Sequence, residues 1–109
     1  MFNPGDLVTA DFPGVTGIKR RPAVVISTPD YQYHRPDVIL GIITTQTLSA
    51  TTPMDYLLQD WASVGLHRAS AFRSFFVTLP ATAVRLMGHC SERDWEAIQI
   101  CLTRAIATQ

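Results

Sequence analysis

The stretch Lys19-Arg20-Arg21-Pro22-Ala23-Val24-Val25-Ile26-Ser27 joins three consecutive cations to an unbroken apolar run. Proline residues bound that run on both sides, and its length is typical of a central strand covered on both faces. We therefore predict a strand over about residues 22 to 27, with Arg21 at its root. A guanidinium on such a rigid base suits planar recognition of phosphate. The three cations also fit a second interpretation, a solvated surface that flanks a strand.

The composition predicts one small domain over residues 1–109. The chain has 109 residues, of which 47% are hydrophobic and 17% charged, and this is enough apolar material for a core. The formal net charge is +0, so any anion site depends on local placement of cations. No signal segment or membrane-length apolar run is visible, which leads us to expect a cytoplasmic protein. Cys90 and Cys101 lack a CxxC spacing, and we expect reduced core thiols.

Alternating and apolar segments outside the basic stretch predict further short strands. Turn-forming residues separate these segments, and the one between the first two strands contains Pro13, Gly14 and Gly17. The additional strands are predicted at residues 7–12, 38–43, 54–57, 71–78 and 86–90. A flexible loop is predicted at residues 13–19 and a single helical turn at residues 59–65.

The C-terminal segment predicts one amphipathic helix over about residues 92–106. Ser91 is a suitable N-cap, and Glu92 and Asp94 place anions in the first turn, where they complement the helix dipole. Apolar residues then recur with helical spacing along one face, namely Trp95, Ile98, Cys101, Leu102, Ala105 and Ile106. Short strands joined by Pro- and Gly-rich turns and followed by one helix indicate a small bent antiparallel sheet or a partly open barrel.

Three polar side chains, Thr44, Thr45 and Gln46, end the most apolar predicted strand. A strand end fixes the backbone while the side chain meets solvent, so it is a good position for a binding site. Thr45 and Gln46 suit hydrogen bonding to a ligand, and they equally suit the capping of a turn.

Segments along nearly the whole chain resemble the MazF/PemK family of toxins. The resemblance is specific because the Arg-Pro-Ala-Val-Val and Ile-Thr-Thr-Gln motifs occur together at this separation. The segments that carry it are Gly5–Val8, Arg20–Ile26, Asp37–Leu40, Ile43–Gln46, Leu86–Gly88 and Ser91–Trp95. It implies a mainly β fold with a C-terminal helix, an SH3-like barrel of the CcdB/PemK (MazF) type, and a homodimer.

The activity that the resemblance implies is that of a toxin of a type II toxin–antitoxin system. Such a toxin is an endoribonuclease that cuts single-stranded mRNA at a short sequence by attack of the ribose 2′-hydroxyl, with no metal and no cofactor. A cognate antitoxin inhibits it, and the complex of the two binds DNA. By position, Arg21 and Thr44 match the family's catalytic arginine and threonine, and residues 13–20 match the segment that closes over RNA.

RNA contacts are expected from Lys19, Arg20, Thr45, Gln46 and Arg73. For Arg73, an ion pair with Asp11 or Asp55 is the alternative interpretation. Aromatic stacking on RNA and anchoring of a local turn both fit Trp61.

Two other functions remain open from the sequence. One is a non-catalytic, CcdB-like toxin that grips DNA gyrase, although retention of both Arg21 and Thr44 argues against it. The other is a degenerate toxin that only binds its antitoxin. A metal site is not expected, because His34, His67 and His89 fit no ligand spacing.

Overall fold

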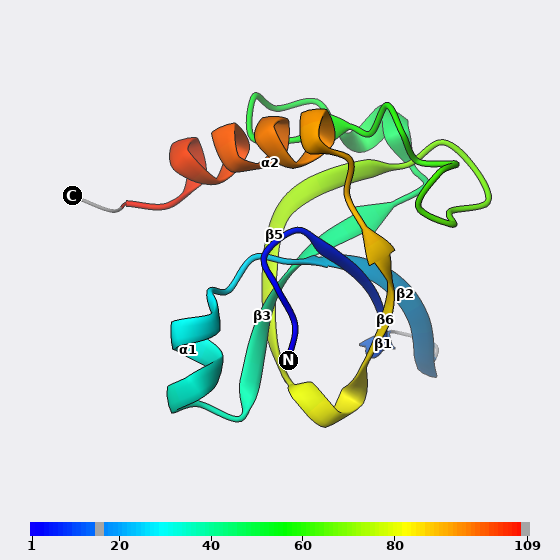
Figure 1. The fold of residues 1–109 in the computed structure, drawn as a ribbon. Helices are drawn as coiled ribbons and strands as arrows, with labels where there is room; N and C mark the ends of the chain where they lie inside the picture. Colours follow the sequence, from blue (N-terminus) through cyan, green and yellow to red (C-terminus); the bar gives the residue numbers. More distant parts are fainter. Residues whose placement is uncertain (15–16, 108–109) are drawn as a thin grey trace.

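The computed structural model describes residues 1–14 and 17–107 and contains one six-stranded sheet (Figure 1). Its order is β4-β5-β3-β2-β1-β6, and every pair of neighbours is antiparallel. The strands are β1 (Asp6–Gly14), β2 (Gly17–Val25), β3 (Asp37–Thr44), β4 (Tyr56–Leu57), β5 (Ala71–Pro80) and β6 (Val84–His89). The helices are α1 (Pro29–His34) and α2 (Glu92–Ala105), with 3-10 turns η1 (Thr47–Ser49) and η2 (Ala81–Ala83).

The sheet curls into a half-barrel, and α2 lies across one side of it (Figure 1). This confirms the predicted mainly β fold with a C-terminal helix. The helix begins as expected, because the Ser91 hydroxyl accepts a hydrogen bond from the Asp94 backbone N–H at 3.3 Å. In the described part of the chain, no helix has the length and apolarity that crossing a bilayer requires.

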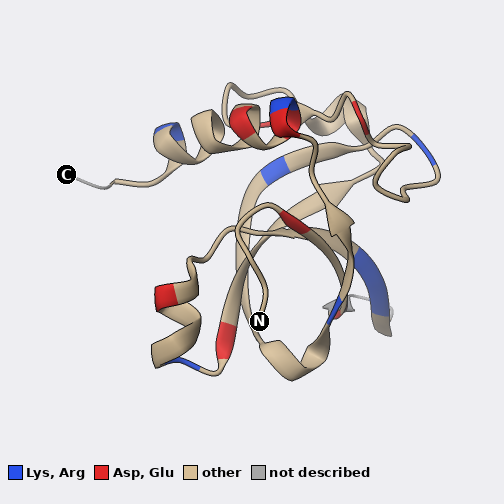
Figure 2. Cartoon of the chain, in the orientation of Figure 1, with Lys and Arg blue, Asp and Glu red and all other residues tan. Residues whose placement is uncertain are grey.

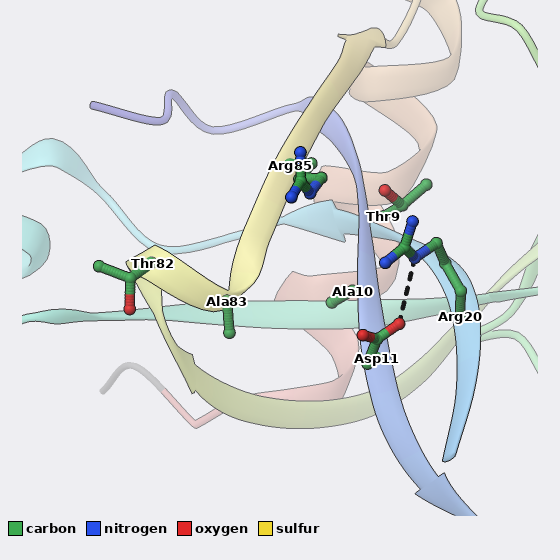
Figure 3. A pocket seen from close by; sticks show the side chains of 7 residues that line it. All are labelled: Thr9, Ala10, Asp11, Arg20, Thr82, Ala83 and Arg85. Carbon is green, nitrogen blue, oxygen red and sulfur yellow. Dashed lines mark hydrogen bonds and ion pairs between the residues drawn. The ribbon is translucent and has the colours of Figure 1, made fainter.

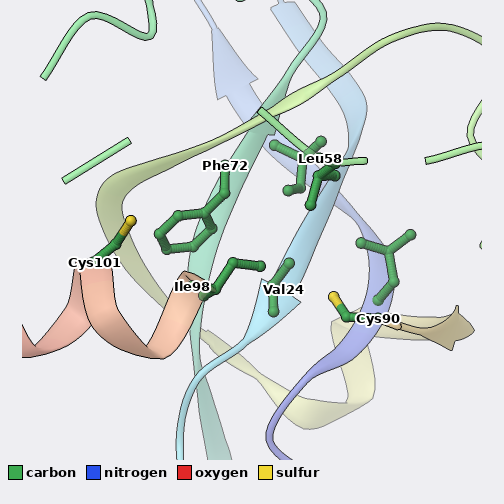
Figure 4. Close-up of a cluster of buried hydrophobic side chains, with 8 residues drawn as sticks. Val24, Leu58, Phe72, Cys90, Ile98 and Cys101 are labelled. Carbon is green, nitrogen blue, oxygen red and sulfur yellow. The ribbon is translucent and has the colours of Figure 1, made fainter. Parts of the chain in front are cut away.

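Two apolar clusters cover the two faces of the central strands. Val24 belongs to the cluster under α2, and Val25 belongs to the cluster inside the curl. This arrangement is why the apolar run in β2 has no polar alternation. The first cluster also contains Cys90 and Cys101, which are free thiols packed near Ile98 (Figure 4). Burial raises the pKa of Cys90 to about 12, so this thiol is unreactive, as expected for a core residue.

Gly41 in β3 packs closely against a neighbouring side chain, so we predict that a larger residue here lowers stability. A Cβ atom at this position would collide with the ring of Phe72, which is fully buried. We expect Gly41→Ala to lower the free energy of unfolding by about 1–3 kcal/mol, measured by urea denaturation. Gly88→Ala is the matched control, because its Cβ would meet nothing closer than 3.4 Å. Equal stability of the two variants would contradict this assignment, and Phe72→Leu should partly rescue Gly41→Ala.

The predicted loop at residues 13–19 is wrong over most of its length. β1 continues to Gly14, β2 begins at Gly17, and the two strands pair up to that point, while residues 15–16 lie outside the described residues. β1 supplies hydrogen-bond partners to the basic end of β2, and pairing of this kind overrides the turn preference of Pro and Gly. The cations Lys19, Arg20 and Arg21 therefore lie on a paired strand, where they form the continuous blue stretch of β2 in Figure 2.

The structure also contains one helix that was not predicted, and it corrects one predicted helical turn. Residues 29–34 form α1, with the Thr28 hydroxyl accepting from the Tyr31 N–H at 3.2 Å and Pro29 in the first turn. Thr-Pro-Asp is a helix start signal as well as a strand breaker. Residues 59–65 form turns rather than a helix, although Gly65 does end the segment with a φ of +92°. Trp61 packs against the core cluster, in agreement with the anchoring interpretation.

Candidate active site

Arg21 and Thr44 lie just beyond the paired part of β2 and β3, and both line one hollow there. Ala23 pairs with Ile42, so continuing this antiparallel register by two residues sets Arg21 against Thr44. Ala23 and Ile42 belong to the same cluster, and side chains two residues apart on a strand share a face. The Arg21 and Thr44 side chains therefore emerge on one face of the sheet, at the ends of adjacent strands.

Pro22 explains why the two strands are open at this point. Proline has no N–H to donate, and the β2–β3 ladder stops at Ala23. A hollow of about 260 Å³ lies at the unpaired end, which we call the Arg21 hollow. Its lining residues are Lys19, Arg20, Arg21, Pro22, Ile43, Thr44 and Thr45. The structure thus brings both predicted catalytic residues together with three of the predicted RNA-binding residues.

Arg20 and Arg21 differ in how their charges are engaged. Successive strand residues point to opposite faces, and Arg20 faces Asp11 on β1, with Nε 3.1 Å from Oδ1 (Figure 3). The hydrogen bond from Arg20 to Asp11 raises the pKa of Arg20, so its charge is retained but locally balanced. Among the described residues, no hydrogen bond or ion pair engages the exposed Arg21 side chain. Arg21 is therefore the arginine available to a ligand in this hollow.

The Thr44 hydroxyl has its donor available. Its Oγ1 accepts a hydrogen bond from the Gln46 backbone N–H at 3.1 Å. This bond uses a lone pair and fixes the rotamer, while the hydroxyl proton stays available to an incoming oxygen. Thr44 can therefore donate to a phosphate oxygen placed between itself and Arg21.

Thr45 and Gln46 lead from the Arg21 hollow into the next loop. Thr45 lines the Arg21 hollow, and both residues line a neighbouring hollow of about 510 Å³ over η1. The Gln46 carbonyl accepts from the Ser49 N–H at 3.1 Å and from its hydroxyl at 2.7 Å. The backbone of Gln46 thus holds a turn, and its exposed side chain is directed by that turn. Both interpretations of Gln46 are compatible with this geometry.

Arg73 lies in a different place. It sits on β5 opposite Ile42 and lines a separate hollow of about 300 Å³ with Asp55 and Phe75. Its guanidinium carbon lies 4.6 Å from the centre of the Phe75 ring, and its Nε is buried without a partner in the described chain. Asp11 is engaged by Arg20, while Asp55 accepts hydrogen bonds from Thr52 and Ser74. An RNA contact by Arg73 stays a prediction and would be made outside the Arg21 hollow.

Two residues that the sequence did not select, His67 and Arg68, border a hollow next to the Arg21 hollow. Both are exposed and lie in the irregular segment before β5. Their position depends on how that segment folds over the sheet, so neither periodicity nor motif spacing could indicate it.

These features together define a class of protein, a small curled β-sheet with a C-terminal helix and a cationic hollow at the ends of two central strands. The chain belongs to the family of PemK-like, MazF-like toxins of type II toxin–antitoxin systems, whose model matches residues 3–106. The resemblance found in the sequence is therefore confirmed. No curated protein sequence matches the chain closely enough to count as a relative.

Solved structures with the same fold support this placement. A mycobacterial endoribonuclease in complex with its cognate antitoxin matches with a TM-score of 0.80 and 16% identity, over 100% of this chain and 98% of that chain. MazE–MazF from Deinococcus radiodurans matches with a TM-score of 0.73 and 16% identity, over 99% of this chain and 97% of that chain. The Mycobacterium tuberculosis toxin MazF-mt6 matches with a TM-score of 0.74 and 19% identity, over 92% of this chain and 94% of that chain. At these identities the likeness shows a shared fold.

Proposed function

We propose that this toxin is a metal-independent endoribonuclease that cleaves single-stranded mRNA at a short sequence. The observation that carries the proposal is the position of Arg21 opposite Thr44, at the mouth of an open strand end. The family membership and the similar structures described as endoribonucleases support it. The proposed site lies in the Arg21 hollow, where Lys19, Arg20 and Thr45 would contact the RNA.

The chemistry proposed for this hollow is an in-line transfer within the RNA strand. The ribose 2′-oxygen forms a bond to the adjacent phosphorus while the bond from phosphorus to the 5′-oxygen breaks. The 2′-hydroxyl loses its proton, the 5′-oxygen gains one, and the products carry a 2′,3′-cyclic phosphate and a 5′-hydroxyl. Negative charge builds on the non-bridging oxygens, and Arg21 and the Thr44 hydroxyl stabilise it there more than in the ground state. Neither side chain serves as a base near neutral pH.

The test is incubation of the purified chain with long single-stranded RNA in excess EDTA. We expect discrete fragments that end in a 2′,3′-cyclic phosphate. Intact RNA across substrates of varied sequence would overturn the proposal and favour a toxin that acts by binding. Cleavage only after addition of a divalent cation would overturn metal independence alone.

Thr44→Ala is expected to lower the single-turnover cleavage rate by about 10–100-fold, less than the loss of the arginine. The variant removes the hydroxyl donor and also the acceptor that the Gln46 N–H uses. Thr44→Ser is the matched control, because it restores both functions of the hydroxyl and should recover most of the rate. A Thr44→Ser variant as slow as Thr44→Ala would indicate that the methyl group, and not the hydroxyl, matters.

The partners of the toxin follow from the same surface. A cognate antitoxin would place an acidic segment over the cations Lys19 and Arg21 and thereby exclude RNA. Two of the similar structures are complexes of a toxin-type protein with its antitoxin, which supports this expectation.

A homodimer is proposed through the exposed apolar face of β5. Phe75 and Phe76 are 58% and 38% exposed, and they line one hollow with Ala105 at the end of α2. Large exposed aromatic side chains beside one another are typical of an interface. We expect Phe75→Glu to shift the chain to a monomer in light scattering after gel filtration, whereas Tyr33→Glu, on α1, should not. A monomeric wild-type chain at micromolar concentration would contradict the dimer.

A further inference from the structure

The hollow beside the Arg21 hollow has a composition that the proposed chemistry does not use. It measures about 390 Å³, and we call it the His67 hollow. Pro22, Leu66 and Met87 give it apolar walls, while His67 and Arg68 add two planar polar side chains. Pro22 and Thr45 line both hollows, so the two hollows adjoin at the ends of β2 and β3.

The segment before His67 is held in place by a backbone hydrogen bond and by packing against the core. Gly65 has a φ of +92°, which favours glycine, and a Cβ atom added there would meet the Met87 side chain of β6 at 3.4 Å. The Leu66 N–H donates to the Trp61 carbonyl at 3.2 Å, and a Cβ at Gly88 would meet the Val64 carbonyl at 3.4 Å. Trp61, Val64 and Leu66 pack against the core cluster. The His67 hollow is therefore preformed rather than assembled by its ligand.

We propose that the His67 hollow binds one nucleobase of the RNA, next to the phosphate that is cleaved at Arg21, and that His67 and Arg68 determine which base is accepted. This inference rests on the proposed function. Imidazole and guanidinium planes stack on unpaired bases, and proteins that read single-stranded RNA splay its bases onto such groups. An apolar floor with a few polar groups at the edge is typical of a site for a small planar ligand. Because the walls are shared, one strand can reach both hollows at once.

The experiment is a digest of random-sequence RNA by the wild type, His67→Ala and Arg68→Ala, with sequencing of the new 5′ ends. We expect a base preference at one position beside the cut in the wild type, flattened at that position alone in the two variants. On the preferred RNA, kcat/KM should fall by about tenfold. His67→Phe keeps a planar ring and should recover part of the preference. Arg104→Ala removes the same charge from the last turn of α2 and should change nothing.

The outcomes separate this inference from the proposed function. If the wild type cuts RNA and both variants keep its base preference, the proposed base pocket is overturned and the proposed nuclease activity is supported. The His67 hollow would then bind a protein segment instead of a base. If the wild type cuts no RNA, the proposed nuclease activity is overturned, and an RNA-binding measurement then tests the base pocket. In that case a fluorescent RNA series with one abasic nucleotide at each position must show weaker binding at one position, in the wild type but not in His67→Ala. Equal binding across the series overturns the pocket.

Discussion

Arg21→Ala is expected to lower the single-turnover rate of RNA cleavage by about 10²–10³-fold or more, because it removes the main preorganised donor from the site. Arg21 lies just beyond the end of the β2–β3 ladder, which stops at Ala23 next to Pro22. Among the described residues, no hydrogen bond or ion pair engages the Arg21 guanidinium. Charge on the phosphate oxygens grows in the transition state, so the loss should appear in rate more than in substrate affinity. The measurement is a time course with enzyme in excess over RNA.

Two companion variants sharpen this test. Arg21→Lys keeps a positive charge but lacks the planar fork, and it should recover only part of the rate. Arg20→Ala should cost less than Arg21→Ala, since the Arg20 charge is already balanced by Asp11 at 3.1 Å. A rate near that of the wild type in Arg21→Ala would remove this residue from the active site. Equal losses in both arginine variants would indicate that net charge, and not position, governs cleavage.

The central strands were predictable because a strand that is buried on both faces appears in the sequence as a continuous apolar run. Val24 and Val25 face different apolar clusters, so the run between Pro22 and Ser27 contains no polar residue. The same holds in β3, where Val38 and Leu40 belong to one cluster and Ile43 to the other. The basic end of β2 has no such pattern, because among the described residues it pairs with β1 alone and its side chains stay exposed.

The candidate site could be predicted only in part. The Arg-Pro and Ile-Thr-Thr-Gln motifs selected Arg21 and Thr44, and register then placed them together. The family resemblance, and not these motifs, led to the expectation that Arg73 contacts RNA. β5 lies beyond β3, and a register shift between Gly41 and Ile42 accompanies a separate hollow for Arg73. Long-range placement of this kind is not encoded in any short motif.

The role of Asp94 was also missed in part, because an anion in the first turn of a helix suggests only a dipole effect. Asp94 is 2% exposed, and its carboxylate accepts from the Tyr56 hydroxyl at 2.6 Å and from the Gln59 and Asp60 N–H groups at 3.0 and 2.9 Å. Burial, with the hydrogen bond to Asp94, raises the pKa of Tyr56 to about 12, so its hydroxyl stays a donor at neutral pH. One side chain of α2 thus holds β4 and the start of the segment that leads to His67.

Asp94→Ala is therefore expected to lower the free energy of unfolding by about 3 kcal/mol or more. The variant leaves three donors without an acceptor, and each part-buried unsatisfied group costs about 1–3 kcal/mol. That is a large share of the roughly 5–15 kcal/mol that stabilises a typical domain. Urea denaturation measures the free energy of unfolding. Asp94→Asn keeps one acceptor oxygen, so its stability should lie between that of the wild type and that of Asp94→Ala. Glu96→Ala, an exposed carboxylate on the same helix, should stay within about 0.5 kcal/mol of the wild type.

Base preference and amide hydrogen exchange can show whether Asp94 holds one local segment or stabilises the fold in general. At a temperature where Asp94→Ala is still folded, the segment from Gln59 to Arg68 has lost two of its anchors. Arg21 is still held by its pairing with β1, and Thr44 by its pairing with β5. We therefore expect cleavage to continue with a weakened base preference and faster amide hydrogen exchange in residues 59–68. An Asp94→Ala variant with wild-type stability would show that these hydrogen bonds are replaced by water. Loss of cleavage with unchanged base preference among residual cuts would place the effect of Asp94 at Arg21 instead of His67.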